Sequence, residues 1–204
     1  MANYRTSRVL PIVLVVVIII IAIAALVSLA RVVFFSGNSS TSTVEVDTSQ
    51  AALLDTSVTH SVRMIVRGPI VADEKFKSYQ IDISSSSRSL KTFNGYGGTV
   101  VEQKDLANNV ASYEAFVYAL DKAELSKGTE LEGDKNDVRG VCATGTLTRF
   151  MILDNSEPVK ELWTSTCSGS KGSLDASVGQ LKDLFVKQIP GAETLVSTGT
   201  TLKL

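Results

Sequence analysis

The N-terminal 30 residues constrain this chain most, because they contain an apolar run that matches the thickness of a lipid bilayer. Residues 9–30 carry no charged side chain, and residues 12–23 are almost entirely isoleucine and valine. A helix rises about 1.5 Å per residue, so about 20 residues cross the ~30 Å hydrocarbon core. In lipid the backbone must satisfy its own hydrogen bonds, which favours a helix. The sequence therefore predicts a transmembrane helix over residues 9–31, a signal anchor that binds the lipid bilayer through residues 9–30.

Basic residues set the expected orientation of this span. Arg5, Arg8 and the α-amino group precede it, whereas only Arg31 follows it closely. Basic residues favour the cytoplasmic side, so residues 1–8 are predicted to form a cytoplasmic tip. The alternative is a signal peptide cleaved after the small-x-small sequence Ser28-Leu29-Ala30. The apolar region of such peptides is usually about 7–15 residues long, which is shorter than this one.

Composition divides the rest of the chain into a linker and one domain. Residues 32–57 are expected to form a Ser/Thr-rich linker and stalk. Within this stalk, residues 48–54 fit either a short helix or an irregular segment. Residues 58–204, about 145 residues, suffice for one ordinary domain with a core. This part is mildly acidic, because no acid precedes Glu45 and three basic residues flank the apolar run. No nucleic-acid partner is expected, since such partners require a basic surface.

Two kinds of apolar periodicity predict the elements of this domain. Alternation of apolar and polar residues is typical of strands, and spacing of three to four residues is typical of helices. The expected strands cover residues 58–67, 78–84, 89–93, 138–153 and 159–167, and the expected helices cover residues 106–125 and 178–189. We interpret this order as two strand–strand–helix units. They predict an α+β two-layer domain, in which both helices cover one face of an antiparallel sheet of about four to five strands.

The two cysteines, Cys142 and Cys167, are predicted to form a disulfide. Both follow the predicted span and would therefore lie in an oxidising compartment. If a hairpin turn centres on Asp154-Asn155, Cys142 and Cys167 oppose each other on antiparallel strands, within bridging distance. Such a bond would stabilise the domain by about 3 kcal/mol. Free buried thiols and a redox-active pair are the alternatives, although catalytic dithiols more often occur as Cys-x-x-Cys at a helix start.

The sequence contains no convincing catalytic, cofactor-binding or metal-binding set. His60 is the only histidine, and a triad would need a nucleophile and a carboxylate to converge on it. The acidic loop over residues 130–137 lacks the spacing of an EF-hand. The glycine-rich residues 94–98 lack the following helix N-terminus that a phosphate loop needs. No cofactor and no metal are therefore expected.

Two aromatic residues are candidate interaction residues. Tyr96 lies in the glycine-rich loop, and loops of this type often carry binding contacts. Trp163 is the only tryptophan, and its position in the expected strand fits either a core residue or an interface anchor.

The overall layout is similar to that of many small bitopic envelope proteins of bacteria. A basic tip, an Ile/Val-rich anchor and a polar linker precede one extracytoplasmic domain. We expect a cell-membrane protein that acts as a non-enzymatic binding or scaffolding module of a cell-envelope assembly, with an envelope protein as its partner.

Two other functions remain open at this point. One is a membrane-tethered hydrolase that uses paired carboxylates, such as Asp73 with Glu74 or Asp82 with Glu102. The other is a ligand sensor, although a cytoplasmic tip of eight residues is too short for an output domain.

Overall fold

The computed structural model describes residues 48–200. The expected tip and anchor lie outside this part, as do most of the linker and residues 201–204. Among residues 48–200, no helix combines the length and the apolar character needed to cross a bilayer. The membrane anchor and the localisation therefore stay predictions.

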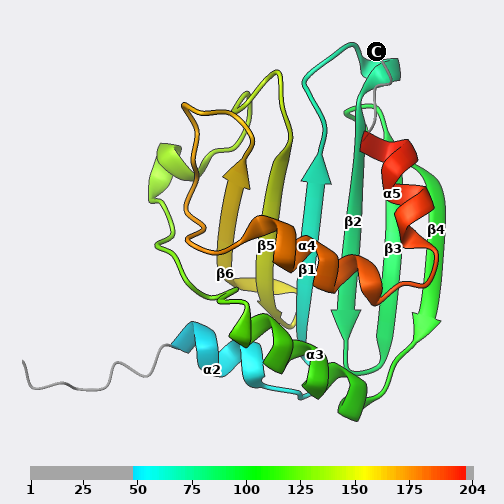
Figure 1. Cartoon of the computed structure of the whole chain (residues 1–204), viewed down its shortest axis with the longest axis vertical. Coiled ribbons are helices and arrows are strands. Elements are labelled where there is room, and N and C mark those ends of the chain that lie inside the picture. Colours follow the sequence, from blue (N-terminus) through cyan, green and yellow to red (C-terminus); the bar gives the residue numbers. More distant parts are fainter. Residues whose placement is uncertain (1–47, 201–204) are drawn as a thin grey trace, which may run out of the picture. The chain divides into compact units, whose positions relative to one another are not determined.

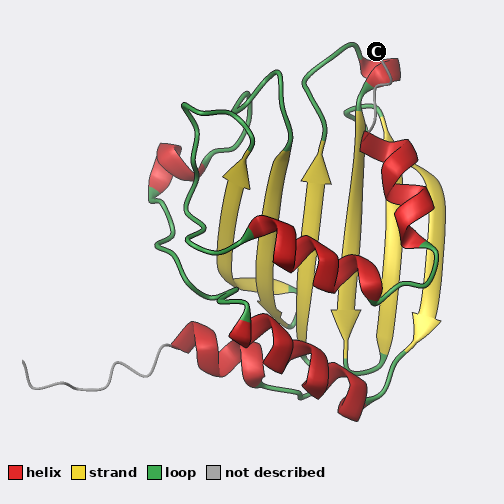
Figure 2. Cartoon of the chain, in the orientation of Figure 1, coloured by secondary structure: helices red, strands yellow, loops and turns green. Residues whose placement is uncertain are grey.

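The described residues form an α+β domain with one antiparallel sheet of six strands (Figure 1). The strand order is β4-β3-β2-β1-β5-β6. The strands are β1 His60–Arg67, β2 Lys77–Ser84, β3 Ser87–Asn94, β4 Thr99–Ala107, β5 Leu147–Asp154 and β6 Glu157–Ser165. The helices are α2 Thr48–Leu54, α3 Val110–Lys122, α4 Val178–Lys187 and α5 Ala192–Thr200, with short 3-10 segments η1 Asp73–Lys75 and η2 Gly133–Asn136. Figure 2 shows α4 crossing in front of the strands and α5 in front of the β2–β3 side.

The expected fold class is confirmed, but the expected sheet of four to five strands and the repeated strand–strand–helix order are wrong. Four strands precede α3, and two strands precede α4 and α5. Strand β4 was missed because nearly all of its side chains are exposed, so it has no alternation between buried and exposed residues. The expected strand over residues 138–153 is too long, because β5 begins at Leu147 and turns occupy the preceding residues. The segment at residues 48–54 is a helix, α2.

The core lies between the helices and one face of the sheet. In β1 and β2 every second side chain is buried, which matches the alternation in the sequence. Phe185 of α4 is completely buried and lies against two further rings. Its ring centroid is 5.3 Å from that of Phe116 in α3 and 5.8 Å from that of Phe150 in β5. Three elements that are distant in the sequence therefore meet at one aromatic cluster.

The second face of the sheet carries half-buried polar side chains. Arg63 of β1 forms an ion pair with Asp82 of β2, with 2.5 Å between Nε and Oδ1. Arg149 of β5 pairs with Glu161 of β6 at 2.7 Å. These pairs connect neighbouring strands across the face, and each partner neutralises the charge of the other.

Candidate interaction surface

The turn between β3 and β4 holds Tyr96 in a defined position at the end of the sheet. The Tyr96 N–H donates to Asp73 Oδ1 at 2.7 Å, and its hydroxyl donates to the Val71 carbonyl at 2.8 Å. Its ring stacks on Phe76, with 4.1 Å between centroids. Gly95 has a φ of +70°, and a Cβ there would lie 2.9 Å from the Asp73 carboxylate, so this turn requires a glycine.

Tyr96 nevertheless remains 53% exposed, and two valines on the same hairpin are similarly exposed. Val100 is 47% and Val101 is 56% exposed. Thr92 opposes Glu102 whereas Phe93 opposes Val100, so Val101 is the extra residue of a β-bulge. We call Tyr96, Val100 and Val101 the hairpin patch. All three side chains are exposed, and hydrogen bonds hold Tyr96 in place.

The hairpin patch lies far from the point at which the described chain begins. Figure 1 shows α2 at the lower left and the β3–β4 turn at the upper right, at opposite ends of the strands. A domain tethered through α2 would therefore present the patch at its far end.

The outer edge of β4 is open, whereas that of β6 is covered. Within residues 48–200, no segment outside β3 forms a hydrogen bond with the backbone of β4. In β6, Trp163 N donates to Ser173 Oγ at 3.0 Å, and Trp163 O accepts from Ser173 N at 2.9 Å. Glu161 N also donates to the Glu130 carboxylate at 2.6 Å. An open edge strand is a template for pairing with another chain.

Trp163 lies in the interior, which corresponds to the core role among the two alternatives. It is 4% exposed, and its Nε1 donates to Asn136 Oδ1 at 3.2 Å. Asn136 belongs to η2 in the expected acidic loop, so this loop covers β6. The ambiguity in the sequence arose because Leu162 and Trp163 are both buried, on opposite faces of β6.

Cys142 and Cys167 form a disulfide, with 2.09 Å between their sulfur atoms and 5.4 Å between Cα atoms. No described cysteine is free. The expected cross-strand geometry is wrong, since both cysteines lie outside β5 and β6. In the hairpin Asp154 opposes Glu157, so the turn lies one residue further along than expected. The bond instead joins the loops at the sheet end, because β5 begins after Cys142 and β6 ends before Cys167.

His60 has polar neighbours that the sequence did not indicate, but their geometry is not that of a catalytic triad. Ser57 Oγ lies 2.8 Å from His60 Nδ1. Asp55 and Asp154 carboxylate oxygens lie 3.6 and 3.8 Å from the same nitrogen. A triad requires the nucleophile and the carboxylate to bind different nitrogens of the ring. The Asp55 carboxylate accepts from Ser57 N, which lowers the Asp55 pKa. The cluster is therefore a polar connection between the α2–β1 loop, β1 and β5.

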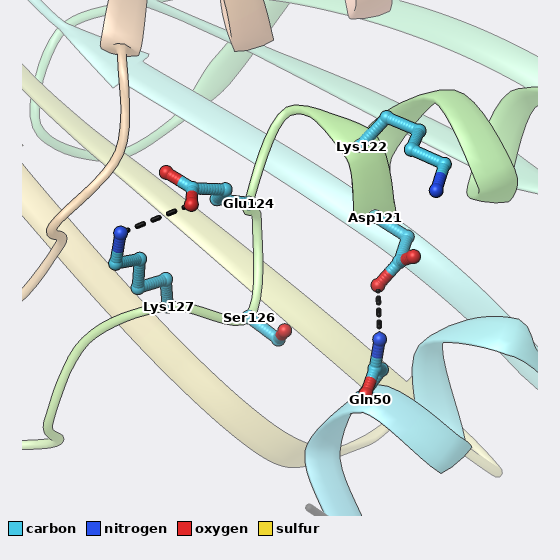
Figure 3. Close-up of a pocket in the computed structure, with 6 residues that line it drawn as sticks. All are labelled: Gln50, Asp121, Lys122, Glu124, Ser126 and Lys127. Carbon is cyan, nitrogen blue, oxygen red and sulfur yellow. Dashed lines mark hydrogen bonds and ion pairs between the residues drawn. The ribbon is translucent and has the colours of Figure 1, made fainter.

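A shallow pocket of about 420 Å³ lies between α2 and the C-terminal end of α3 (Figure 3). Its polar lining consists of Gln50, Asp121, Lys122, Glu124, Ser126 and Lys127. Asp121 accepts a hydrogen bond of 2.7 Å from Gln50, and Glu124 pairs with Lys127 at 3.0 Å. Both carboxylates are thus already engaged with neighbours in this open pocket, which offers no acid and base poised on a substrate.

The other expected carboxylate pairs are not brought together as a hydrolase would need. Asp82 pairs in register with Ser89 on the polar face, whereas Glu102 opposes Thr92 on the helix-covered face. Asp73 is occupied by the Tyr96 N–H. Among the described residues, no cluster of three or more His, Cys, Asp or Glu side chains has the geometry of a metal site.

No protein-family model matches this chain, and the curated proteins contain no match to it.

Proposed function

We propose that this chain is a single-pass, membrane-anchored binding or scaffolding module of a cell-envelope assembly. Residues 9–30 would hold it in the bilayer, and the α+β domain would lie outside the cytoplasm and bind an envelope protein. The apolar run and the flanking arginines support the anchor and its orientation. The Cys142–Cys167 disulfide supports an oxidising compartment for the domain.

The hairpin patch is the observation that carries the binding role. Exposed aromatic and β-branched side chains that are held rigidly lose little entropy on binding, and tyrosine is enriched in interfaces. Hydrogen bonds to Val71 and Asp73 fix Tyr96 before any partner binds. The patch is also at the end of the domain opposite to α2 (Figure 1).

Crosslinking in intact cells of the native host tests this function. The full-length chain is crosslinked, purified from membranes and analysed by mass spectrometry for the proteins bound to it. We expect a reproducible envelope protein with the wild-type chain, and its loss when Val100 and Val101 are both changed to serine. Retention of the same partner by that variant would contradict the role of the hairpin patch.

A matched control comes from α3. Val110 is 54% exposed, close to the 56% of Val101, but it lies on the helix instead of the hairpin. The Val110→Ser variant should keep the partner, which separates a specific loss from a general effect of removing exposed valine. Extraction with alkaline carbonate tests the anchor separately, and release of the wild-type chain from membranes would overturn it.

A further inference from the structure

The exposed edge of β4 carries a charge pattern that selects one partner. Seven of its nine residues are exposed, and three charged side chains follow one another closely: Glu102, Lys104 and Asp105. Lysines and bulges on edge strands normally prevent indiscriminate pairing with other chains. Strand β4 has both features, Lys104 and the bulge at Val101. Only a strand whose charges complement this pattern would pair with the edge at no electrostatic cost.

The positions of these side chains restrict how a second β4 strand could pair with the first. Lys104 opposes the buried Leu90 and Glu102 opposes Thr92, so both lie on the helix-covered face. Gln103 opposes Lys91 and Asp105 opposes Ser89, on the polar face. Two copies that extend one sheet are related by a two-fold axis normal to it, which keeps each face on its own side. Opposed residues must therefore come from the same face. The axis then lies midway between the two copies of one residue, and each possible register can be named by that central residue.

Charge then selects one register among the four residues from Glu102 to Asp105. A register centred on Glu102, on Lys104 or on Asp105 places that charged residue opposite its own copy, which is repulsive. The register centred on Gln103 places Glu102 of each copy opposite Lys104 of the other. That register forms two ion pairs on the helix-covered face and opposes no like charges.

We infer that β4 pairs with β4 of a second copy in this register, centred on Gln103, to form a two-fold dimer with a continuous sheet. Each copy contributes the backbone of residues 101–105, a length typical of paired strands. Lys104 Nζ donates to the Pro190 carbonyl and has two further donors for the partner's Glu102. The bulge at Val101 ends the pairing, because the strand bends there.

The dimer leaves most of the hairpin patch available and is compatible with the proposed anchor. Tyr96 lies outside the paired residues. The two-fold axis reverses the strand direction, so α2 of one copy lies at the opposite end from α2 of the other. A chain of 16 residues, the length from 32 to 47, reaches at most about 53–58 Å when fully extended, whereas a nine-residue strand is about 30 Å long. Both copies can therefore be tethered to one membrane.

Cysteine crosslinking of the full-length chain in membranes tests the register. In the proposed pairing the two Gln103 residues face each other at a Cα separation of about 5 Å, within the range of a disulfide. We expect Gln103→Cys to form a covalent dimer on mild oxidation. Asp105→Cys is the matched control, since Asp105 is exposed on the same face but its two copies would lie about 14 Å apart. The described native cysteines already form a disulfide, so they contribute no free thiol. Equal crosslinking of the two variants, or none for Gln103→Cys, would overturn the inference.

A charge exchange in the Gln103→Cys chain tests the ion pairs independently. Glu102→Lys replaces two attractive pairs by two repulsive ones, and we expect the crosslinked fraction to fall about tenfold. Adding Lys104→Glu restores opposite charges and should restore the dimer. A double variant that dimerises no better than the single variant would contradict this register. The envelope-partner experiment reads out a different protein, so failure of one proposal is distinguishable from failure of the other.

Discussion

The two edges of the sheet differ in how the rest of the chain treats them. The segment at residues 173–174 covers the β6 edge, the Glu130 side chain binds it, and the disulfide joins the loops beside it. The β4 edge has no such cover among the described residues, and its hairpin exposes Tyr96, Val100 and Val101. A covered edge serves stability, whereas an exposed edge is available for contacts. Under the proposed function, this difference divides stability and recognition between opposite sides of the domain, and the following predictions test this division.

The largest effect is expected from Trp163→Ala on the covered side. This change removes a side chain that is 4% exposed, together with its hydrogen bond to Asn136. We expect a loss of about 3–5 kcal/mol in the free energy of unfolding, because a large cavity remains. Urea unfolding of the detergent-solubilised chain, followed by circular dichroism, measures this loss. A loss below about 1 kcal/mol would contradict a stabilising role for this edge.

Loss of the disulfide should rank next. Replacing Cys142 and Cys167 by serine removes a crosslink between residues 25 apart. The expected destabilisation is about 3 kcal/mol, from the greater freedom of the unfolded chain. The same urea experiment under reducing conditions should shift the wild-type chain but leave the double serine variant unchanged. An equal response of both chains would show that reduction acts elsewhere.

A buried tyrosine in the central strands, between the two edges, should make the stability of the domain depend on pH. Burial raises the pKa of Tyr79 in β2 to about 12, whereas an unfolded tyrosine ionises near 10. The folded state therefore binds the proton more tightly, so stability is full below pH 10 and falls as the pH rises toward 12. We expect a loss of about 2–3 kcal/mol over this range. Tyr79→Phe should weaken this dependence in alkaline urea titrations, and an unchanged slope would assign it to another group.

A smaller effect is expected where one hydrogen bond covers the β6 edge. Ser173→Ala removes the acceptor of Trp163 N in a buried position. Leaving that donor unpaired should cost about 1–2 kcal/mol. Hydrogen exchange of the Trp163 amide should accelerate in parallel, and a protected amide in the variant would mean that another acceptor replaces Ser173.

The smallest effect is expected on the exposed side. Val101→Ser changes a side chain that is 56% exposed, so the free energy of unfolding should change by less than about 0.5 kcal/mol. Partner capture should nevertheless fall in intact cells. A large destabilisation would show that the hairpin patch is structural, and the division between the two edges would not hold.

Parts of this fold were predictable because they have a buried face. The alternation in β1 and β2 and the helical spacing in α4 reflect side chains that point into one core. No side chain of β4 is fully buried, so its sequence carries no period that could identify it. The pairing of Cys142 with Cys167 was predictable from their number and from the compartment that the sequence predicts. Their position in the loops was not, because the length of β5 depends on its pairing with β1.

By itself, the sequence determined the apolar run and its flanking charges, the α+β class, and the pairing of the two cysteines. These properties depend on composition and local period, which need no knowledge of distant neighbours. Only the tertiary structure decided which strand is left uncovered, where Tyr96 is held, and that Trp163 is buried beneath the loop of Asn136. Such features arise from contacts between residues far apart in the chain, and a local pattern contains no information about which distant segment will cover a given face.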